Sequence, residues 1–161
     1  MKKLLVLCSV FLIFSCPTFE LDLKMNEISL FKYMKFSEKN LYDYIHALGF
    51  KDPIFVFKQS INESGWWEGN LYKQTNNLFS MHKAERRETT ADYWILADQG
   101  KFCGYSHWTK SVNDLKLYEN WIQKSYPTIP YQQAIKLAGY CPNNKYVKWV
   151  NNINYDFSKL N

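Results

Sequence analysis

The chain has 161 residues, a length that suits one domain with its own hydrophobic core and is too short for two. Hydrophobic residues make up 47% of the chain and aromatic residues 18%, which is more ring surface than a core requires, so we expect some rings to line a groove. The formal net charge is +5, a balance that ordinary solubility explains, and we expect no nucleic-acid partner.

Residues 1–16, MKKLLVLCSVFLIFSC, have the layout of a secretory signal. Two lysines precede an apolar run that is too short for a convincing membrane span, and small residues follow it. The end of the run resembles a bacterial lipoprotein signal, in which cleavage before Cys16 leaves that cysteine to carry the lipid. Ordinary cleavage and an uncleaved anchor are the alternatives. All three predict export, and we favour a lipoprotein anchored to a membrane of the cell envelope.

Export leaves two cysteines inside the domain. Cys8 would be removed with the signal and Cys16 acylated, so Cys103 and Cys141 remain. An oxidising compartment allows a disulfide between them, and two unlinked buried thiols are an equally good interpretation. The histidines are scattered along the sequence, at His46, His82 and His107. Because no Cys/His spacing suggests a metal site, we predict neither a metal nor a cofactor.

Residues 17–36 show no sustained hydrophobic period and are predicted to be a tether that leads into the domain. The domain itself is predicted to span residues 37–161. It begins with Ser37 as the N-cap of a helix that Gly49 ends. The apolar residues of this helix recur at helical spacing and are Leu41, Tyr44, Ile45 and Leu48.

A second helix is predicted to begin at Asp52 and Pro53, because proline's missing N–H costs nothing at the first helical position. It ends near Glu63. The segment 70–82 is predicted to be a turn and a short helix. Residues 86–107 combine β-branched and aromatic residues with a polar turn, which predicts an irregular β-hairpin or flap.

Helical spacing returns in the last third of the chain. The longest helix carries apolar residues from Val112 to Ile122 and is stopped by Pro127. Two short helices follow, one near 131–138 and one that begins at Asn143 or Asn144. The predicted fold class is therefore α+β, mainly α, with a small β excursion in the middle of the sequence.

Glu63 lies at the predicted end of its helix, beside Trp66 and Trp67. Unsatisfied carbonyls at a helix end disfavour negative charge, and apolar rings exclude water, so both effects raise the pKa of a carboxyl. A residue that donates a proton near neutral pH requires such a pKa. Taken alone, Glu63 is also compatible with an ordinary solvated carboxylate.

The surrounding stretch, SINESGWWEGNLYKQTNNLFSMH, holds two short motifs, Glu-Ser-Gly-Trp and Asn-Asn-Leu-Phe, with a leucine between them. FCGYSHWTKSVND and YQQAIKLAGYCPNNKYVKWVNNI follow in order. Together these elements resemble glycoside hydrolase family 73, the bacterial N-acetylglucosaminidase domain of the lysozyme superfamily, over roughly residues 37–154. The chain departs from that pattern at Trp67, Ser80 and 141–143. Trp67 could stack on a sugar or fill the core.

The resemblance implies a lysozyme-like fold and a peptidoglycan hydrolase that cleaves the β-1,4 bond between N-acetylglucosamine and N-acetylmuramic acid. Glu63 would be the general acid, and Tyr140 would support the charged transition state or position water. The partner would be the glycan strands of peptidoglycan, and a basic protein suits an anionic cell-wall polymer. The residues assigned to substrate binding are Trp66, Asn76, Asn77, Trp94, Tyr105 and Tyr146. Structural roles are the alternative for Tyr140, for Tyr146 and for at least one asparagine.

The remaining tryptophans are assigned either to the groove or to the core. We place Trp108 in the groove with the rings named above, because sugar faces stack on aromatic planes. Trp121 and Trp149 are predicted to lie in the core, because both fall at helical spacing with other apolar residues.

A second carboxylate is usual in glycoside hydrolysis, as base or as nucleophile. The candidates are Glu85, Glu88 and Asp92, and we favour Glu88 and Asp92 because they flank the start of the flap. The 2-acetamido group of the substrate could act instead, so the stereochemistry stays open. A muramidase or lytic transglycosylase, and a glycan-binding module without catalysis, are the alternative functions.

Overall fold

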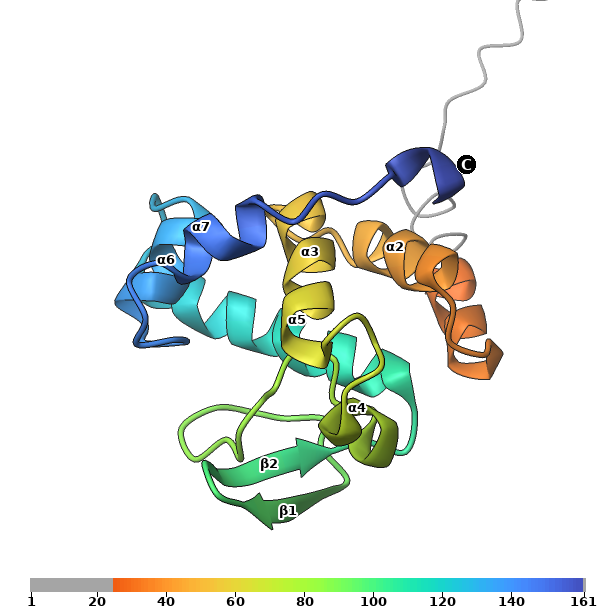
Figure 1. Ribbon diagram of the computed structural model, residues 1–161, viewed down its shortest axis with the longest axis horizontal. Helices are drawn as coiled ribbons and strands as arrows, with labels where there is room; N and C mark the ends of the chain where they lie inside the picture. Colours follow the sequence, from red (N-terminus) through yellow and green to blue (C-terminus); the bar gives the residue numbers. More distant parts are fainter. Residues whose placement is uncertain (1–24, 161) are drawn as a thin grey trace, which may run out of the picture.

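Helices dominate the part of the chain that the computed structural model describes, residues 25–160 (Figure 1). The elements are η1 (Phe31–Tyr33), α2 (Glu38–Ala47), α3 (Pro53–Ser64), α4 (Asn70–Thr75), β1 (Tyr93–Ala97), β2 (Gly100–Gly104), α5 (Trp108–Ser125), α6 (Tyr131–Leu137), α7 (Tyr146–Asn151) and η2 (Phe157–Leu160). This confirms the predicted class, a mainly helical, lysozyme-like α+β fold.

The helix boundaries follow from local side-chain chemistry. The Ser37 hydroxyl accepts from the Asn40 N–H at 3.1 Å and begins α2. The Asp52 carboxylate accepts from the Phe55 N–H at 3.1 Å and begins α3, with Pro53 as its first residue. Gly65 ends α3 in a left-handed conformation, with φ of 60°. All three signals lie where the sequence predicted them.

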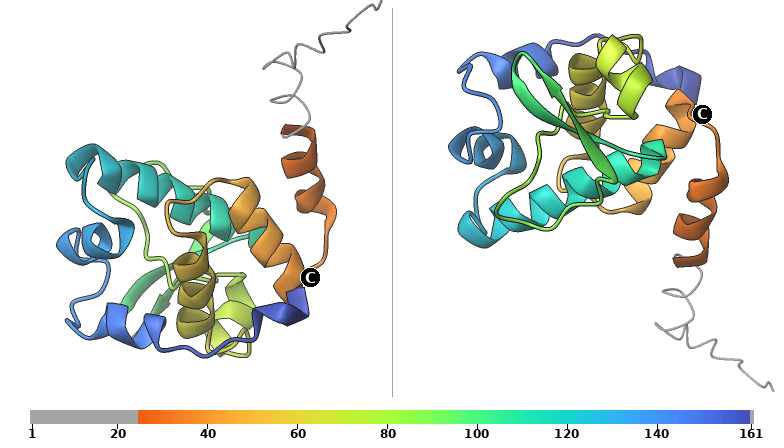
Figure 2. Two further views of the ribbon diagram at one scale, coloured as in Figure 1. Left: turned by 90° about the horizontal axis from the view of Figure 1, so that it is seen from above. Right: turned by 90° about the horizontal axis from the view of Figure 1, so that it is seen from below.

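The core forms around α5, which packs against α2 and α6, while α3 packs against α2 and α7. Figure 1 shows α5 crossing behind α3, with α6 and α7 to one side and α4 with the hairpin below. Figure 2 shows the same arrangement from above and below. The fully buried aliphatic residues of these helices are Leu41, Ile45, Val56, Ile61, Val112, Leu115, Ile135 and Val150.

The β excursion is one antiparallel hairpin. Strand β1 pairs with β2 in a register that sets Tyr93 opposite Gly104 and Ala97 opposite Gly100. Gly104 is required here, since a Cβ on it would lie 2.2 Å from the Tyr93 ring. An isolated bridge between His82 and Phe102 joins the preceding segment to β2.

The segment before α2 differs from the predicted tether where it is described. Residues 25–30 are helical and η1 continues them. Phe31 is buried against the Tyr44 ring, and the Phe36 ring contacts Trp67, Tyr72 and Trp108. Residues 25–36 therefore belong to the domain, because their aromatic side chains complete its core. Residues 17–24 and the predicted signal, with Cys16, lie outside the described residues.

The last residues of the domain meet the start of α2 in a clasp. The Lys39 ammonium donates to the Leu160 carbonyl at 2.9 Å, and the Tyr155 hydroxyl donates to the Glu38 carboxylate. Figures 1 and 2 show the C-terminal end of the chain beside α2.

Cys103 and Cys141 are not linked, so the disulfide interpretation is wrong for this fold. The Cys103 thiol is buried under the hairpin and donates to the His82 carbonyl at 3.2 Å. Cys141 is half-buried in the loop between α6 and α7. Across residues 25–160, no helix has the length and apolar content needed to cross a membrane.

Candidate active site

A cleft of about 810 Å³ opens beside the last turn of α3, and Glu63 is one of the residues that line it. Its other walls come from residues 79–87, from Trp121 of α5 and from the loop 138–142 after α6. We call residues 82–92 the cleft loop, because this segment has no helix or strand and residues 82–87 all line the cleft.

The sequence after Glu63 turns the chain sharply. Gly65, Trp66 and Trp67 have φ values of 60°, 58° and 60°, a left-handed run that costs a non-glycine residue about 1–2 kcal/mol. The Ser64 hydroxyl accepts from the Trp67 N–H at 2.9 Å and the Ser64 carbonyl accepts from the Gly69 N–H at 2.9 Å. This turn buries Trp67 in the core and leaves 53% of Trp66 exposed.

Burial raises the pKa of the Glu63 carboxyl, and this is the largest influence on it. Hydrogen bonding by the Tyr146, Ser80 and Asn62 side chains acts in the opposite direction and is weaker in sum. The direction agrees with the prediction from the sequence. A half-buried carboxyl with a raised pKa keeps its proton to higher pH than an ordinary glutamic acid, which suits a proton donor.

Two tyrosines flank the acid. Tyr140 lines the cleft, and its hydroxyl donates to the Phe79 carbonyl at 2.6 Å, so it is tied to the backbone. Tyr146 is only 5% exposed, and its hydroxyl has no hydrogen-bond partner within 3.5 Å. It faces the Glu63 carboxyl and lowers that carboxyl's pKa. Burial and the nearby Glu63 charge raise the pKa of Tyr146, which keeps its hydroxyl protonated.

The second carboxylate in the cleft is Glu85, which lies on the cleft loop. The preference for Glu88 and Asp92 is wrong, because neither lines this cleft. Asp92 is paired with Lys110 and accepts from the Ser106 N–H at 2.7 Å, and Lys110 lowers its pKa. Glu88 lines a neighbouring groove instead.

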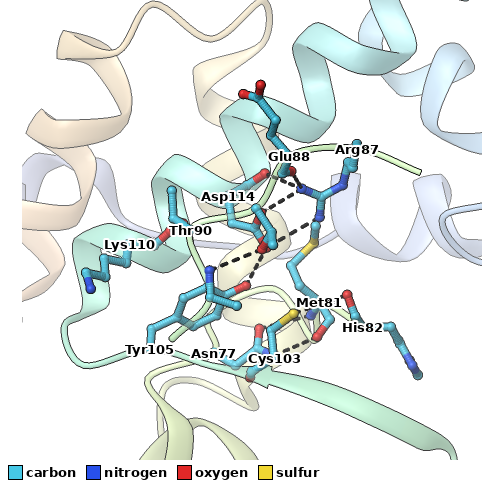
Figure 3. Close-up of polar contacts among 12 residues, drawn as sticks. Asn77, Met81, His82, Arg87, Glu88, Thr90, Cys103, Tyr105, Lys110 and Asp114 are labelled. Carbon is cyan, nitrogen blue, oxygen red and sulfur yellow. Dashed lines mark hydrogen bonds and ion pairs between the residues drawn. The ribbon is translucent and has the colours of Figure 1, made fainter. Parts of the chain in front are cut away.

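A buried ion pair fixes the cleft loop. Asp114 of α5 is fully buried and accepts from both terminal nitrogens of Arg87, at 2.6 and 3.3 Å. The Tyr105 hydroxyl donates to the same carboxylate at 2.6 Å, and the Arg87 guanidinium also lies 5.5 Å from the centre of the Tyr118 ring. Figure 3 shows Arg87, Tyr105 and Asp114 converging, with the Glu88 carboxylate directed away from them.

Three residues predicted to bind substrate hold the protein together instead. The Asn76 amide donates to the Tyr105 carbonyl at 2.9 Å and Asn76 ends α4 with φ of 54°. Asn77 is buried, and its amide donates to Met81 and Cys103 carbonyls at 2.9 Å (Figure 3). Tyr105 is buried against Asp114. None of the three side chains lines the cleft.

The tryptophans are arranged differently from the prediction. Trp66 and Trp94 are exposed, as expected for binding rings, but neither lines the cleft, and the Lys83 ammonium covers Trp94 at 4.5 Å from the ring centre. Trp108 is a core residue. Trp149 is exposed, and Trp121 is 37% exposed and lines the cleft. Trp121 directly precedes the buried Ile122 on α5. A closer comparison of their positions around the helix would have predicted that the Trp121 side chain is only partly buried.

Among residues 25–160, no group of three histidine, cysteine or acidic side chains could hold a metal ion. The polar and titratable groups that line the cleft include Glu63, Glu85, His82, Cys141, the hydroxyls of Tyr118 and Tyr140, and the cations of the cleft loop. An acid with a raised pKa and a second carboxylate line the same cleft, and glycoside hydrolysis uses such a pair.

The comparisons with known proteins point in the same direction. A family whose description reads "mannosyl-glycoprotein endo-beta-N-acetylglucosaminidase", the glucosaminidase domain, matches residues 39–159. No curated protein and no solved structure matches the sequence. The matched range contains every residue that lines the cleft.

Proposed function

The chain belongs to the glucosaminidase family, and on that premise we propose that it cleaves the β-1,4 bond between N-acetylglucosamine and N-acetylmuramic acid in peptidoglycan. Membership supports glycosidase action on peptidoglycan in general, and the choice of bond is our proposal. The observation that carries it is Glu63, a half-buried acid with a raised pKa inside the cleft.

Glu63 acts as the general acid. It gives its proton to the glycosidic oxygen as the bond to the anomeric carbon breaks, so the leaving sugar departs as a neutral alcohol. Glu63 then carries a negative charge. The Tyr146 and Ser80 hydroxyls lower its pKa and so favour that charge: the Tyr146 hydroxyl has no other partner, and the Ser80 hydroxyl lies beside Glu63, where it donates to the Glu63 carbonyl at 3.2 Å.

Glu85 is our candidate for the base. It would take a proton from a water molecule whose oxygen attacks the anomeric carbon, and this single displacement inverts the configuration there. Its place in the same cleft as Glu63 supports this role. Attack by the substrate's own 2-acetamido group is the alternative, which would retain configuration and leave Glu85 dispensable.

The test is digestion of purified peptidoglycan by the wild type and by Glu63→Gln, followed by borohydride reduction and mass spectrometry of the released fragments. We expect reduced N-acetylglucosamine ends from the wild type, and release about 10²–10⁴-fold slower from Glu63→Gln. Glu68→Gln is the matched control, because Glu68 is exposed and pairs only with Lys73.

Other products would overturn parts of the proposal. Reduced muramic acid ends would identify a muramidase, and anhydro ends a lytic transglycosylase. Binding to peptidoglycan without release from either protein would identify a glycan-binding module.

We also propose export and lipid attachment at Cys16, on the sequence of residues 1–16 alone. The mass of the N-terminal peptide from the purified protein tests this. An unmodified or missing Cys16 would contradict it.

A further inference from the structure

A second groove adjoins the cleft. It has a volume of about 650 Å³ and lies between the cleft loop and α5. Its lining residues are Arg86, Arg87, Glu88, Leu117, Asn120, Trp121 and Lys124. Arg86, Arg87 and Trp121 line the cleft as well, so the two cavities share a wall and a chain in one could send a branch into the other.

The charged residues that line this side groove differ in whether a carboxylate of the protein already pairs with them. Arg87 is engaged by the buried Asp114, so its charge is already compensated. Within residues 25–160, neither Arg86 nor Lys124 forms an ion pair with a carboxylate. Glu88 is the one acidic residue among those that line the groove. The groove thus offers two cations and one anion to a ligand.

We propose that the side groove binds the peptide stem carried by N-acetylmuramic acid, and that Arg86 and Lys124 recognise the carboxylates of that stem. This inference rests on the proposed function, because it assumes that the glycan lies in the cleft. A stem peptide branches from the sugar chain, and the side groove shares a wall with the cleft in which that chain would lie. It carries several carboxylates and, where it contains a diamino acid, one amino group.

The ligand chemistry matches the lining side chains. Guanidinium binds a carboxylate through two parallel hydrogen bonds, and the ammonium of Lys124 supplies a second positive charge on α5. Glu88 is positioned to pair with the amino group. The uncharged sugar backbone has no group that calls for two cations, which is why we assign them to the stem rather than to the glycan.

Activity on two substrates tests the assignment. Intact peptidoglycan is compared with the same glycan strands after an amidase has removed the stems, for the wild type and for Arg86→Gln/Lys124→Gln. Because Arg86 also lines the cleft, the readout is the ratio of the rate on intact peptidoglycan to the rate on stripped strands, and we expect this ratio to fall about fivefold in the double variant. Lys136→Gln/Lys148→Gln removes the same charge from exposed sites and controls for general attraction to an anionic polymer.

A binding measurement does not depend on turnover. The probe is the isolated stem tetrapeptide, and the readout is the indole N–H resonance of Trp121, assigned by its loss in Trp121→Phe. We expect the peptide to shift this resonance in the wild type, with millimolar affinity, and not in Arg86→Gln/Lys124→Gln.

Each outcome of these two experiments either supports or overturns the proposed stem site. No shift with the peptide, an equal loss of activity on both substrates, or an equal loss in the control double variant would overturn the stem site. Because the peptide titration needs no catalysis, a failure of Glu63→Gln to reduce activity would refute the proposed function and leave the titration result standing.

Discussion

The acid end of the cleft and the cleft loop face the same cavity, but they are held in different ways. Glu63 is placed by neighbouring residues: α3 with its Asp52 cap, and the left-handed turn that begins at Gly65. The cleft loop has no regular structure, and its central anchor is the pair between Arg87 and Asp114, residues far apart in the sequence. The acid thus depends on local sequence, and its partner wall depends on long-range contacts, among which the pair between Arg87 and Asp114 is buried.

Breaking that contact should have the largest effect on stability. Asp114→Ala leaves the Arg87 charge and the Tyr105 hydroxyl buried without their partner, so we expect the free energy of unfolding to fall by about 3–5 kcal/mol. Urea unfolding measures it. Asp98→Ala, at the exposed tip of the hairpin, should change stability by less than about 0.5 kcal/mol. A loss below about 1 kcal/mol for Asp114→Ala would mean that the loop is held mainly by other contacts.

A second experiment tests whether the cleft loop supplies a catalytic group in addition to forming a wall of the cleft. Glu85→Gln should lower kcat about 100-fold, as expected for loss of a general base, while Glu88→Gln on intact folded protein stays within about threefold. The two substitutions are matched in charge and lie three positions apart. Equal effects would remove Glu85 from the mechanism and favour the acetamido group as nucleophile.

The smallest expected effect is a shift in the pKa of Glu63. The Tyr146 hydroxyl lowers the pKa of Glu63, so Tyr146→Phe should raise that pKa and move the alkaline limb of the pH–rate profile to higher pH. Tyr140→Phe should leave the limb in place, because the Tyr140 hydroxyl donates to the Phe79 carbonyl. A downward shift for Tyr146→Phe would mean that its hydroxyl does not stabilise the Glu63 carboxylate.

The same pKa fixes the sign of a stability effect. Folding raises the pKa of Glu63, so its contribution to stability is fully present below the unfolded pKa and is lost as pH rises through the folded one. Above that range, Glu63→Gln should be more stable than the wild type.

The features that the sequence predicted correctly are those set by neighbouring residues. Caps, stop signals and the acid at the end of α3 depend on a few adjacent side chains, and Ser37, Asp52 and Gly65 act as expected. Ring placement was less predictable. Tyr105 is buried against Asp114 of α5, and Trp108, the first residue of α5, packs against Phe36 and Tyr44, contacts that no local pattern records.

The cleft loop explains most of the remaining errors. Its residues follow no hydrophobic period, so the sequence could not decide which of its carboxylates enters the cleft. The decision rests on Arg87 reaching Asp114, a contact between positions 27 residues apart. Asn77 illustrates the same limit: a motif residue that suits sugar binding instead satisfies buried carbonyls from two other segments.

The clasp between α2 and η2 has a mechanical consequence. Because Lys39 meets Leu160, η2 is held against the start of α2, and none of the clasp residues lines the cleft. A force that pulls η2 away from α2 would therefore act on the clasp and would not pass through the cleft. The cavity would keep its shape while η2 is displaced.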